Sequence, residues 1–183
     1  MNKLIQLSLF CGLLATLAVS TAHAQQRSTK KTPSPVLTQA EADWLTLLRT
    51  DEKLARDTYL TLYQMYKQPI FANIAKSEQK HMDSVKTLLD RYKLPDPVAG
   101  MGVGQFPEGT IQGYDFRATY EALVSEGAQS LSDAYAVGVF IEEFDIEHLT
   151  DALLVVLKLD IKTVFQNLRD GSFSHLAAFK SKL

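Results

Sequence analysis

Four long stretches of the chain repeat apolar residues at spacings of three and four, and this period most constrains the fold. The stretches cover about 38–67, 69–92, 130–156 and 160–179. Apolar residues at this spacing form one stripe along an amphipathic helix. No segment alternates polar and apolar residues over a length that predicts a strand. Long helices with one apolar stripe each favour an all-α four-helix bundle.

Local signals place the ends of these helices. Thr38 and Glu41 have the spacing of a capping box, and Pro69 stands where the first turn of a helix tolerates proline. A short amphipathic helix is expected over 116–126, ended by Gly127. We also expect Asp160 to cap the last helix and Gly171 to mark a bend or break within it.

The connection between the second and third long helices is too long for a tight turn. Its segment 94–115 holds five of the nine glycines and three of the six prolines. We therefore predict a long crossover, which lets the second and third long helices run parallel.

The first 24 residues have the pattern of a secretory signal peptide. Lys3 precedes an apolar run over 4–19, and Ala22-His23-Ala24 forms a small-x-small cleavage site. The polar segment 25–36, with two prolines, is predicted to be a flexible linker, followed by the bundle domain over 37–183. We expect export to the periplasm or outside the cell, with no stable membrane anchor after cleavage.

Composition narrows the classes further. Apolar residues make up 46% of the chain, charged residues 22%, and the formal net charge is −2. These values exclude a disordered chain and a polytopic membrane protein. The chain also lacks the excess of basic residues that would indicate a nucleic-acid partner. The single cysteine, Cys11, lies in the signal segment, so the exported fold must rely on its core, on a metal, or on both. The sequence does not indicate the oligomeric state.

Ionisable side chains interrupt the apolar stripes near the middle of each long helix. They are Glu52, Glu78, His81, Glu142, Asp145 and His175. Carboxylates are rarely buried unless they are paired or bind a metal. Each residue alone has a simpler explanation as an ion pair or a core histidine. Lys and Arg are scarce on these stripes, however, so a metal cation is the partner that we predict.

The pair Glu78 and His81 is the most specific element. A spacing of three places both side chains on one helix face, as in the Glu-x-x-His motifs of bundle-core di-metal sites. Oxygen-rich ligation with a few nitrogens suits two ions of iron, and manganese or zinc can also enter such a site.

Several segments carry a family resemblance: 51–59, 69–75, 77–82, 141–146 and 174–179. They resemble the ferritin-like family catalogued as domain of unknown function 2202, over about residues 37–179. The resemblance implies a ferritin-like bundle with a carboxylate-bridged metal centre.

The resemblance also implies roles for individual residues. Glu52 is the ligand from the first helix, Glu78 bridges, and His81 binds the ion that Glu52 holds. Glu142 or Glu143 serves from the third long helix, and His175 binds the second ion.

One position departs from the wider ferritin-like pattern. Ser172 stands three residues before His175, where a glutamate is expected. Either Asp145 takes over that role, or the second ion is weakly bound or absent. Glu147 and His148 are expected on the surface or at its boundary.

Tyr59 has two interpretations, and three functions remain open. Tyr59 is either a catalytic phenol that donates a hydrogen bond or an electron at the centre, or a core aromatic residue. The first function is di-iron or di-manganese chemistry linked to oxygen or peroxide, including ferroxidase activity. The second is metal sequestration without turnover, and the third is a structural helical bundle that binds no metal.

Overall fold

The described part of the chain consists of helices joined by loops, which confirms the prediction of an all-α helical bundle. The computed structural model describes residues 36–183, so the predicted signal peptide over 1–24 and, apart from Val36, the linker over 25–36 lie outside the described residues. The helices are α1 (Gln39–Tyr66), α2 (Pro69–Tyr92), α3 (Phe116–Gly127), α4 (Leu131–Val155) and α5 (Leu159–Lys180).

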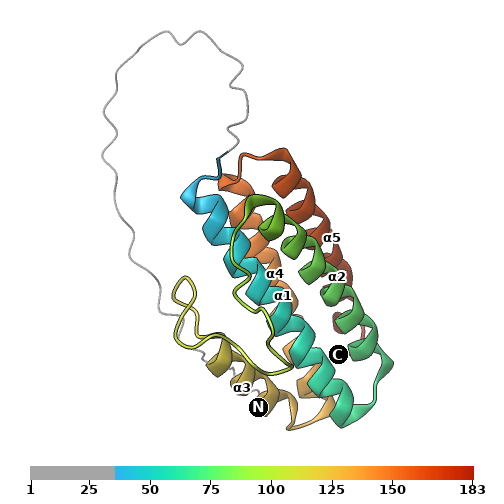
Figure 1. Ribbon diagram of the computed structural model, residues 1–183. Coiled ribbons are helices and arrows are strands. Elements are labelled where there is room, and N and C mark those ends of the chain that lie inside the picture. The colour runs from blue at the N-terminus through green and yellow to red at the C-terminus, as the bar shows by residue number, and fades with distance from the viewer. Residues whose placement is uncertain (1–35) are drawn as a thin grey trace, which may run out of the picture. The chain divides into compact units, whose positions relative to one another are not determined.

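Two helical hairpins, α1–α2 and α4–α5, pack side by side (Figure 1). Contacts between them fix the directions of the helices. Asp51 meets His148 and Tyr59 meets Glu142, so residue numbers fall along α4 as they rise along α1, and these two helices are antiparallel. Because α2 is also antiparallel to α1, α2 and α4 run in the same direction. The long crossover therefore connects two parallel helices, as its length predicted.

The ends of α1 and α2 follow the sequence signals. Thr38 and Glu41 form the predicted capping box, and Pro69 is the first residue of α2. The prediction for the last helix was wrong in detail, because its N-cap is Lys158 rather than Asp160. Asp160 lies within the first turn, where its carboxylate accepts hydrogen bonds from side chains of α2 instead.

Glu41 also joins the two hairpins. Its Oε2 accepts the backbone N–H of Thr38 at 2.9 Å. Its Oε1 accepts the backbone N–H groups of Leu157 and Lys158 at 2.9 and 3.0 Å, at the start of α5. A single buried carboxylate therefore satisfies orphan donors at the beginnings of two helices.

The apolar core is divided into two clusters along the bundle. One contains Tyr59, Phe71 and Phe179. The other contains Leu45 and Phe165, with neighbours from α2 and α4. The polar positions of the stripes fall between these clusters in each long helix, so the fold places them at mid-height and away from solvent.

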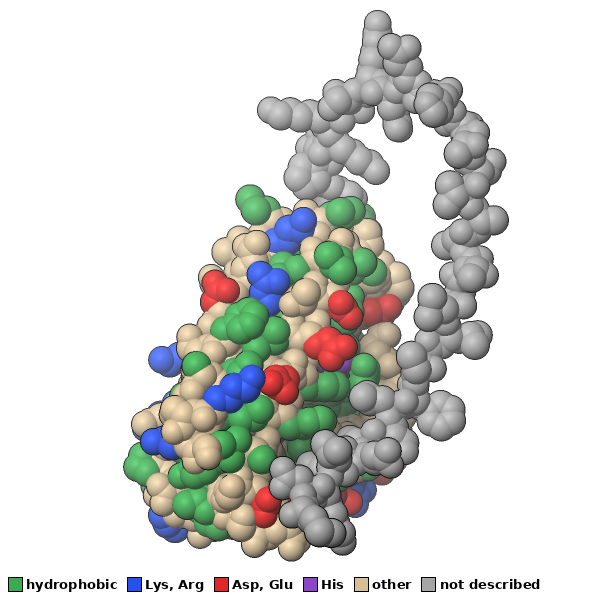
Figure 2. Space-filling view, turned by 180° about the vertical axis from the view of Figure 1, so that it is seen from behind, with side chains coloured by type: hydrophobic (Ala, Val, Ile, Leu, Met, Phe, Trp, Pro, Cys, Tyr) green, Lys and Arg blue, Asp and Glu red, His purple; other side chains and the backbone are tan. Residues whose placement is uncertain are grey.

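On the face that Figure 2 draws, hydrophobic side chains are interspersed with acidic and basic ones. None of the helices within residues 36–183 combines the length and the apolar character required to span a bilayer.

Candidate metal centre

Two overlapping groups of ligand-type side chains lie at the middle of the bundle. The first group is Glu52 of α1 with Glu78 and His81 of α2. The second group is Glu78 with Glu142 of α4 and His175 of α5. Within each group, one ligand atom per residue lies within 4.8 Å of the others. Glu78 belongs to both groups, so all four long helices contribute to one centre.

Glu78 lies between the two imidazoles. Its Oε2 is 2.7 Å from Nδ1 of His81, and its Oε1 is 2.7 Å from Nδ1 of His175. The outer carboxylates complete the arrangement, with Glu52 Oε2 at 3.2 Å from His81 Nδ1 and Glu142 Oε2 at 3.5 Å from His175 Nδ1. Each oxygen of Glu78 therefore faces a different imidazole.

Many of these polar atoms lack hydrogen-bond partners. The buried atoms without one include Oε1 of Glu52, both oxygens of Glu78, Oε2 of Glu142, Oδ2 of Asp145 and Nδ1 of His175. The contacts of Glu78 with the imidazoles are short, but they lack the angles of well-directed hydrogen bonds. Buried unpartnered polar atoms are uncommon and costly. Within residues 36–183, no lysine or arginine pairs with these four carboxylates, so the donor set fits divalent cations.

The three candidate residues of α4 differ in where their side chains lie. Glu142 is fully buried in the second group. Asp145 is also buried and belongs to neither group, but the charges of Glu52, Glu142 and Glu78 act on it. Glu143 lies outside the centre, because its side chain is 55% exposed and pairs with Lys180 at 2.8 Å. Glu147 is exposed, as expected.

Burial and mutual repulsion shape the ionisation of the carboxylates. Burial raises the pKa of Glu52 to about 8 and that of Glu142 to about 7. The pKa of Asp145 is also raised by burial, and then by the charge of Glu52. Burial acts in the same direction on Glu78, but its contacts with His175 and His81 outweigh burial and lower its pKa. Glu78 is therefore the carboxylate that stays charged without a metal.

The imidazoles respond to the same charges. Burial acts to lower the pKa of His81 and of His175, but the neighbouring carboxylates outweigh it and raise both values. Protons therefore neutralise this cluster when no cation does so. Ligands must lose those protons to bind a metal, so binding releases protons and depends on pH.

Tyr59 connects the centre to the aromatic cluster. Its hydroxyl donates to Oε1 of Glu142 at 2.7 Å, and its ring lies 5.2 Å from that of Phe179. Burial, followed by the charge of Glu142, raises the pKa of Tyr59 well above its usual value, so the phenol keeps its proton. Tyr59 thus meets the condition for orienting a ligand carboxylate, while its catalytic role stays a prediction.

Two small residues, Gly171 and Ser172, precede His175 in α5. Ser172 is buried, and its hydroxyl donates to the backbone oxygen of Leu168 within α5. Gly171 lies against His81, because a Cβ atom at position 171 would come within 2.8 Å of the ring. Helix α5 continues through Gly171, so no break occurs there. The glycine instead provides room for an imidazole from α2.

The structure corrects the expectation that His148 lies at the surface. The residue is only 5% exposed. Its Nδ1 lies 2.8 Å from Asp51 Oδ2, and its Nε2 lies 3.0 Å from the hydroxyl of Tyr114 in the crossover. The missed signal was the spacing of Asp145 and His148, which repeats the three-residue spacing of Glu78 and His81.

The fold and the site together define a class: helical bundle proteins with a buried cluster of carboxylates and imidazoles. Comparison of the sequence with known protein families identifies the family. The family model described as uncharacterized protein domain DUF2202 matches residues 41–183, and the chain belongs to this family.

A relative and a solved structure agree with this membership. The chain is 44% identical over 147 residues to uncharacterized protein MJ0754 of Methanocaldococcus jannaschii, covering 80% of this chain and 77% of that protein. It is also similar to the crystal structure of hypothetical protein MJ0754 from Methanococcus jannaschii. That match has a TM-score of 0.74 and 42% identity, and covers 82% of this chain and 83% of the other.

Proposed function

We propose that this protein is an exported, ferritin-like metal protein with a two-ion centre of iron or manganese, and that it performs redox chemistry linked to oxygen or peroxide, or oxidises Fe(II). One observation carries the proposal. Glu78 presents one oxygen to each of two imidazoles, and each neighbouring carboxylate keeps one buried oxygen without a hydrogen-bond partner: Oε1 of Glu52, Oε2 of Glu142 and Oδ2 of Asp145.

The residues divide into ligands and supports. Glu52 and His81 would hold one ion, Glu142 and His175 the other, and Glu78 would bridge them. Bound iron or manganese supplies one-electron redox steps, and zinc would supply only structural or Lewis-acid character.

The remaining residues prepare the site. Tyr59 holds one oxygen of Glu142 through its hydroxyl, which leaves Oε2 directed at the second group. Phe71 and Phe179 pack on Tyr59 and exclude water from that side. Asp145 places a further carboxylate at the border of the centre, where it can balance charge.

A second function, metal sequestration without turnover, is favoured by one observation. Ser172 is small, buried and bonded to its own helix, so α5 supplies only His175 to the second group. A second ion held by few ligands would bind weakly, and a protein with one tight ion could store or buffer metal. A structural bundle without metal is the third alternative, and it would leave the unpartnered carboxylates unexplained.

Two experiments test these functions in turn. Elemental analysis of protein purified from its native compartment should find iron or manganese at up to two ions per chain, and metal-free protein would contradict the proposal. Anaerobic loading with Fe(II), followed by air, should then produce new near-ultraviolet absorption. Bound iron without a spectral change would favour sequestration.

Export forms a separate part of the proposal. We expect signal removal after Ala24 and a mature chain that begins at Gln25. Intact mass of the exported protein measures this directly. A lipid adduct on a retained Cys11 would contradict the anchor-free protein.

A further inference from the structure

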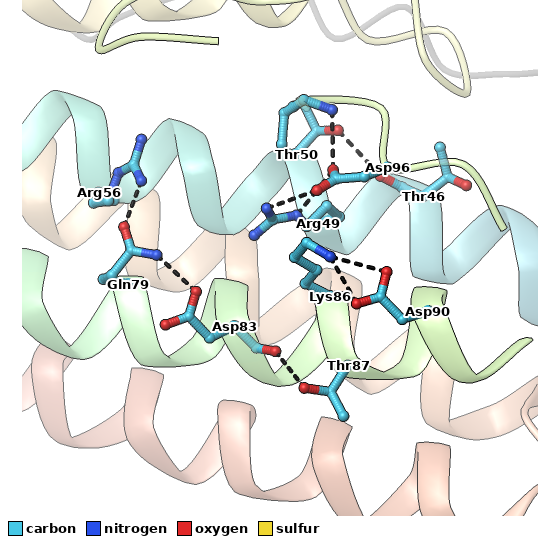
Figure 3. Close-up of polar contacts among 11 residues, drawn as sticks. Thr46, Arg49, Thr50, Arg56, Gln79, Asp83, Lys86, Thr87, Asp90 and Asp96 are labelled. Carbon is cyan, nitrogen blue, oxygen red and sulfur yellow. Dashed lines mark hydrogen bonds and ion pairs between the residues drawn. The ribbon is translucent and has the colours of Figure 1, made fainter. Parts of the chain in front are cut away.

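A positively charged cavity lies outside the metal centre, between α1, α2 and the start of the crossover. Its volume is about 360 Å³, in the range of small-molecule sites. Its cationic lining residues are Arg49, Lys53 and Arg56 of α1 and Lys86 of α2. Figure 3 shows Arg49 and Arg56 on α1 facing Gln79 and Lys86 on α2. Asp96, from the crossover, is the acidic residue in this lining.

Arg49 carries an unused donor at this cavity. Its Nε and Nη2 donate to the two oxygens of Asp96, at 3.1 and 2.9 Å. The side chain is only 8% exposed, and its Nη1 is buried without a hydrogen-bond partner. Buried guanidinium nitrogens normally find acceptors. The Asp96 pair therefore fixes the guanidinium and leaves Nη1 without an acceptor.

The neighbouring cations are held in position by acids that lie outside the lining. Lys53 pairs with buried Asp57, and its Nζ donates to the backbone oxygen of Gly102 at 2.7 Å. Arg56 also binds Asp57, with Nη2 at 2.6 Å from Oδ1. These contacts orient the side chains before any ligand arrives, which lowers the entropy cost of binding.

The charge of the wall remains positive after these pairs are counted. Lys86 pairs with Asp90, which is exposed on α2. The four cations of the lining are therefore balanced by three acids, of which Asp96 belongs to the lining and Asp57 and Asp90 lie outside it. Gln79 is neutral; it accepts from Arg56 and donates to the exposed Asp83. Apolar residues, among them Met82, Val98 and Met101, complete the wall.

We infer that this cavity binds the phosphate group of a small molecule. Guanidinium groups recognise phosphate through charge-assisted hydrogen bonds, and the unpartnered Nη1 of Arg49 offers such a donor. Lys86 adds a flexible point charge from the opposite helix, and the apolar wall accommodates an organic substituent. The site is separate from the metal ligands, so the inference does not depend on the proposed redox function.

Calorimetric titration of the purified protein with inorganic phosphate and with glycerol 3-phosphate, at constant ionic strength, tests this inference. We expect saturable binding of one ligand per chain, with and without prior chelator treatment. Tighter binding of glycerol 3-phosphate would assign an organic phosphate as the ligand, and equal or weaker binding would assign free phosphate.

Variants locate the binding. Arg49→Lys keeps the charge but removes the unpartnered Nη1, and should weaken binding roughly tenfold. Lys86→Gln should weaken it about threefold, because Lys86 is half exposed. Lys80→Gln removes the same charge from an exposed position of α2 outside the cavity, and should bind as the parent does.

Three results would overturn the inference. They are the absence of saturable binding, binding that disappears with chelator because the anion binds a metal, and equal affinities for Lys86→Gln and Lys80→Gln. Circular dichroism should confirm that Arg49→Lys is folded, and if it is not, the Lys86→Gln comparison decides.

Discussion

The two ligand groups share Glu78 but are assembled differently. The first group comes entirely from the α1–α2 hairpin, whose helices are separated by two residues. The second group requires α2, α4 and α5, and therefore the docking of one hairpin on the other. We therefore expect the first group to keep its geometry when the hairpins move slightly. The distances within the second group should change with the packing of the hairpins.

Their surroundings differ as well. In the second group, Tyr59 already occupies one oxygen of Glu142. In the first group, Oε2 of Glu52 faces His81 at 3.2 Å, and no tyrosine hydroxyl among the described residues holds the other oxygen, which is unpartnered. The first group needs no docking between hairpins, and α5 supplies only His175 to the second, so we expect the first group to bind its ion more tightly.

The largest effect should come from the residue that both groups share. Glu78→Gln preserves shape but removes the charge between the imidazoles, so both ions should lose at least about 100-fold in affinity. Metal content after gel filtration measures this loss. Glu143→Gln makes the same chemical change on an exposed residue of α4 and should retain both ions. If Glu78→Gln also retains them, Glu78 is not a bridge.

The histidines should separate the two groups. His175→Ala should lose the weaker ion and keep one, whereas His81→Ala should lose the tighter ion. Stepwise titration with Mn(II), followed by stoichiometry, distinguishes the two. Identical loss of both ions in each variant would mean that the two groups act as one site.

Thermal melting against pH should show the charges of the metal-free centre. The pKa of Glu52 is raised from 4.5 to about 8 and that of Glu142 from 4.5 to about 7. A group whose pKa is higher in the folded than in the unfolded protein stabilises the fold when it is protonated. This contribution is complete below the pKa of the unfolded state and is lost as pH rises through the pKa of the folded state. His81 and His175, also raised, act in the same direction above about pH 6.5.

The chelator-treated protein should therefore melt at lower temperature as pH increases from about 5 to 8. Each tenfold change in proton affinity is worth about 1.4 kcal/mol, or roughly 3–6 °C at this chain length. Glu78, whose pKa is lowered, contributes oppositely, but only below pH 4.5. Metal-loaded protein should show the reverse trend, because ligands bind deprotonated. Parallel curves for the two forms would count against a metal centre.

The smallest effect should come from Tyr59→Phe. Loss of the hydroxyl removes one hydrogen bond to Glu142 and should cost about 1 kcal/mol in the free energy of unfolding, without changing metal stoichiometry. Chemical denaturation measures the cost. Tyr63→Phe is the matched control, because Tyr63 lies on the same helix without a hydroxyl partner at the centre. A loss of the second ion would show that Tyr59 is essential to that group.

The sequence predicted burial of ionisable residues well where one helix face faces the core. Glu52, Glu78 and Glu142 stand on apolar stripes, and all three are at most 1% exposed. Helical spacing alone was sufficient for Glu78 and Glu142, because α2 and α4 bury essentially the face that carries the stripe. It could not decide between Glu142 and Glu143 until the register of α4 was known.

The sequence predicted less where a helix is enclosed on several sides. Helix α1 packs against α2, α3 and α4, and residues 47–55 are all buried. A single stripe therefore missed buried Lys53 and Asp57, whose partners include the backbone of the crossover. His148 was missed for the same reason, since Tyr114 of the crossover covers it.

Gly171 has an evolutionary consequence. Since any side chain at this position would collide with the His81 ring, two residues from different helices are tied to one another. We expect them to vary together: family members that keep the histidine should keep the glycine, and those that lost the histidine should be free to carry alanine. In an alignment across the family, the presence of His81 in α2 should therefore be predictable from the glycine at position 171 in α5.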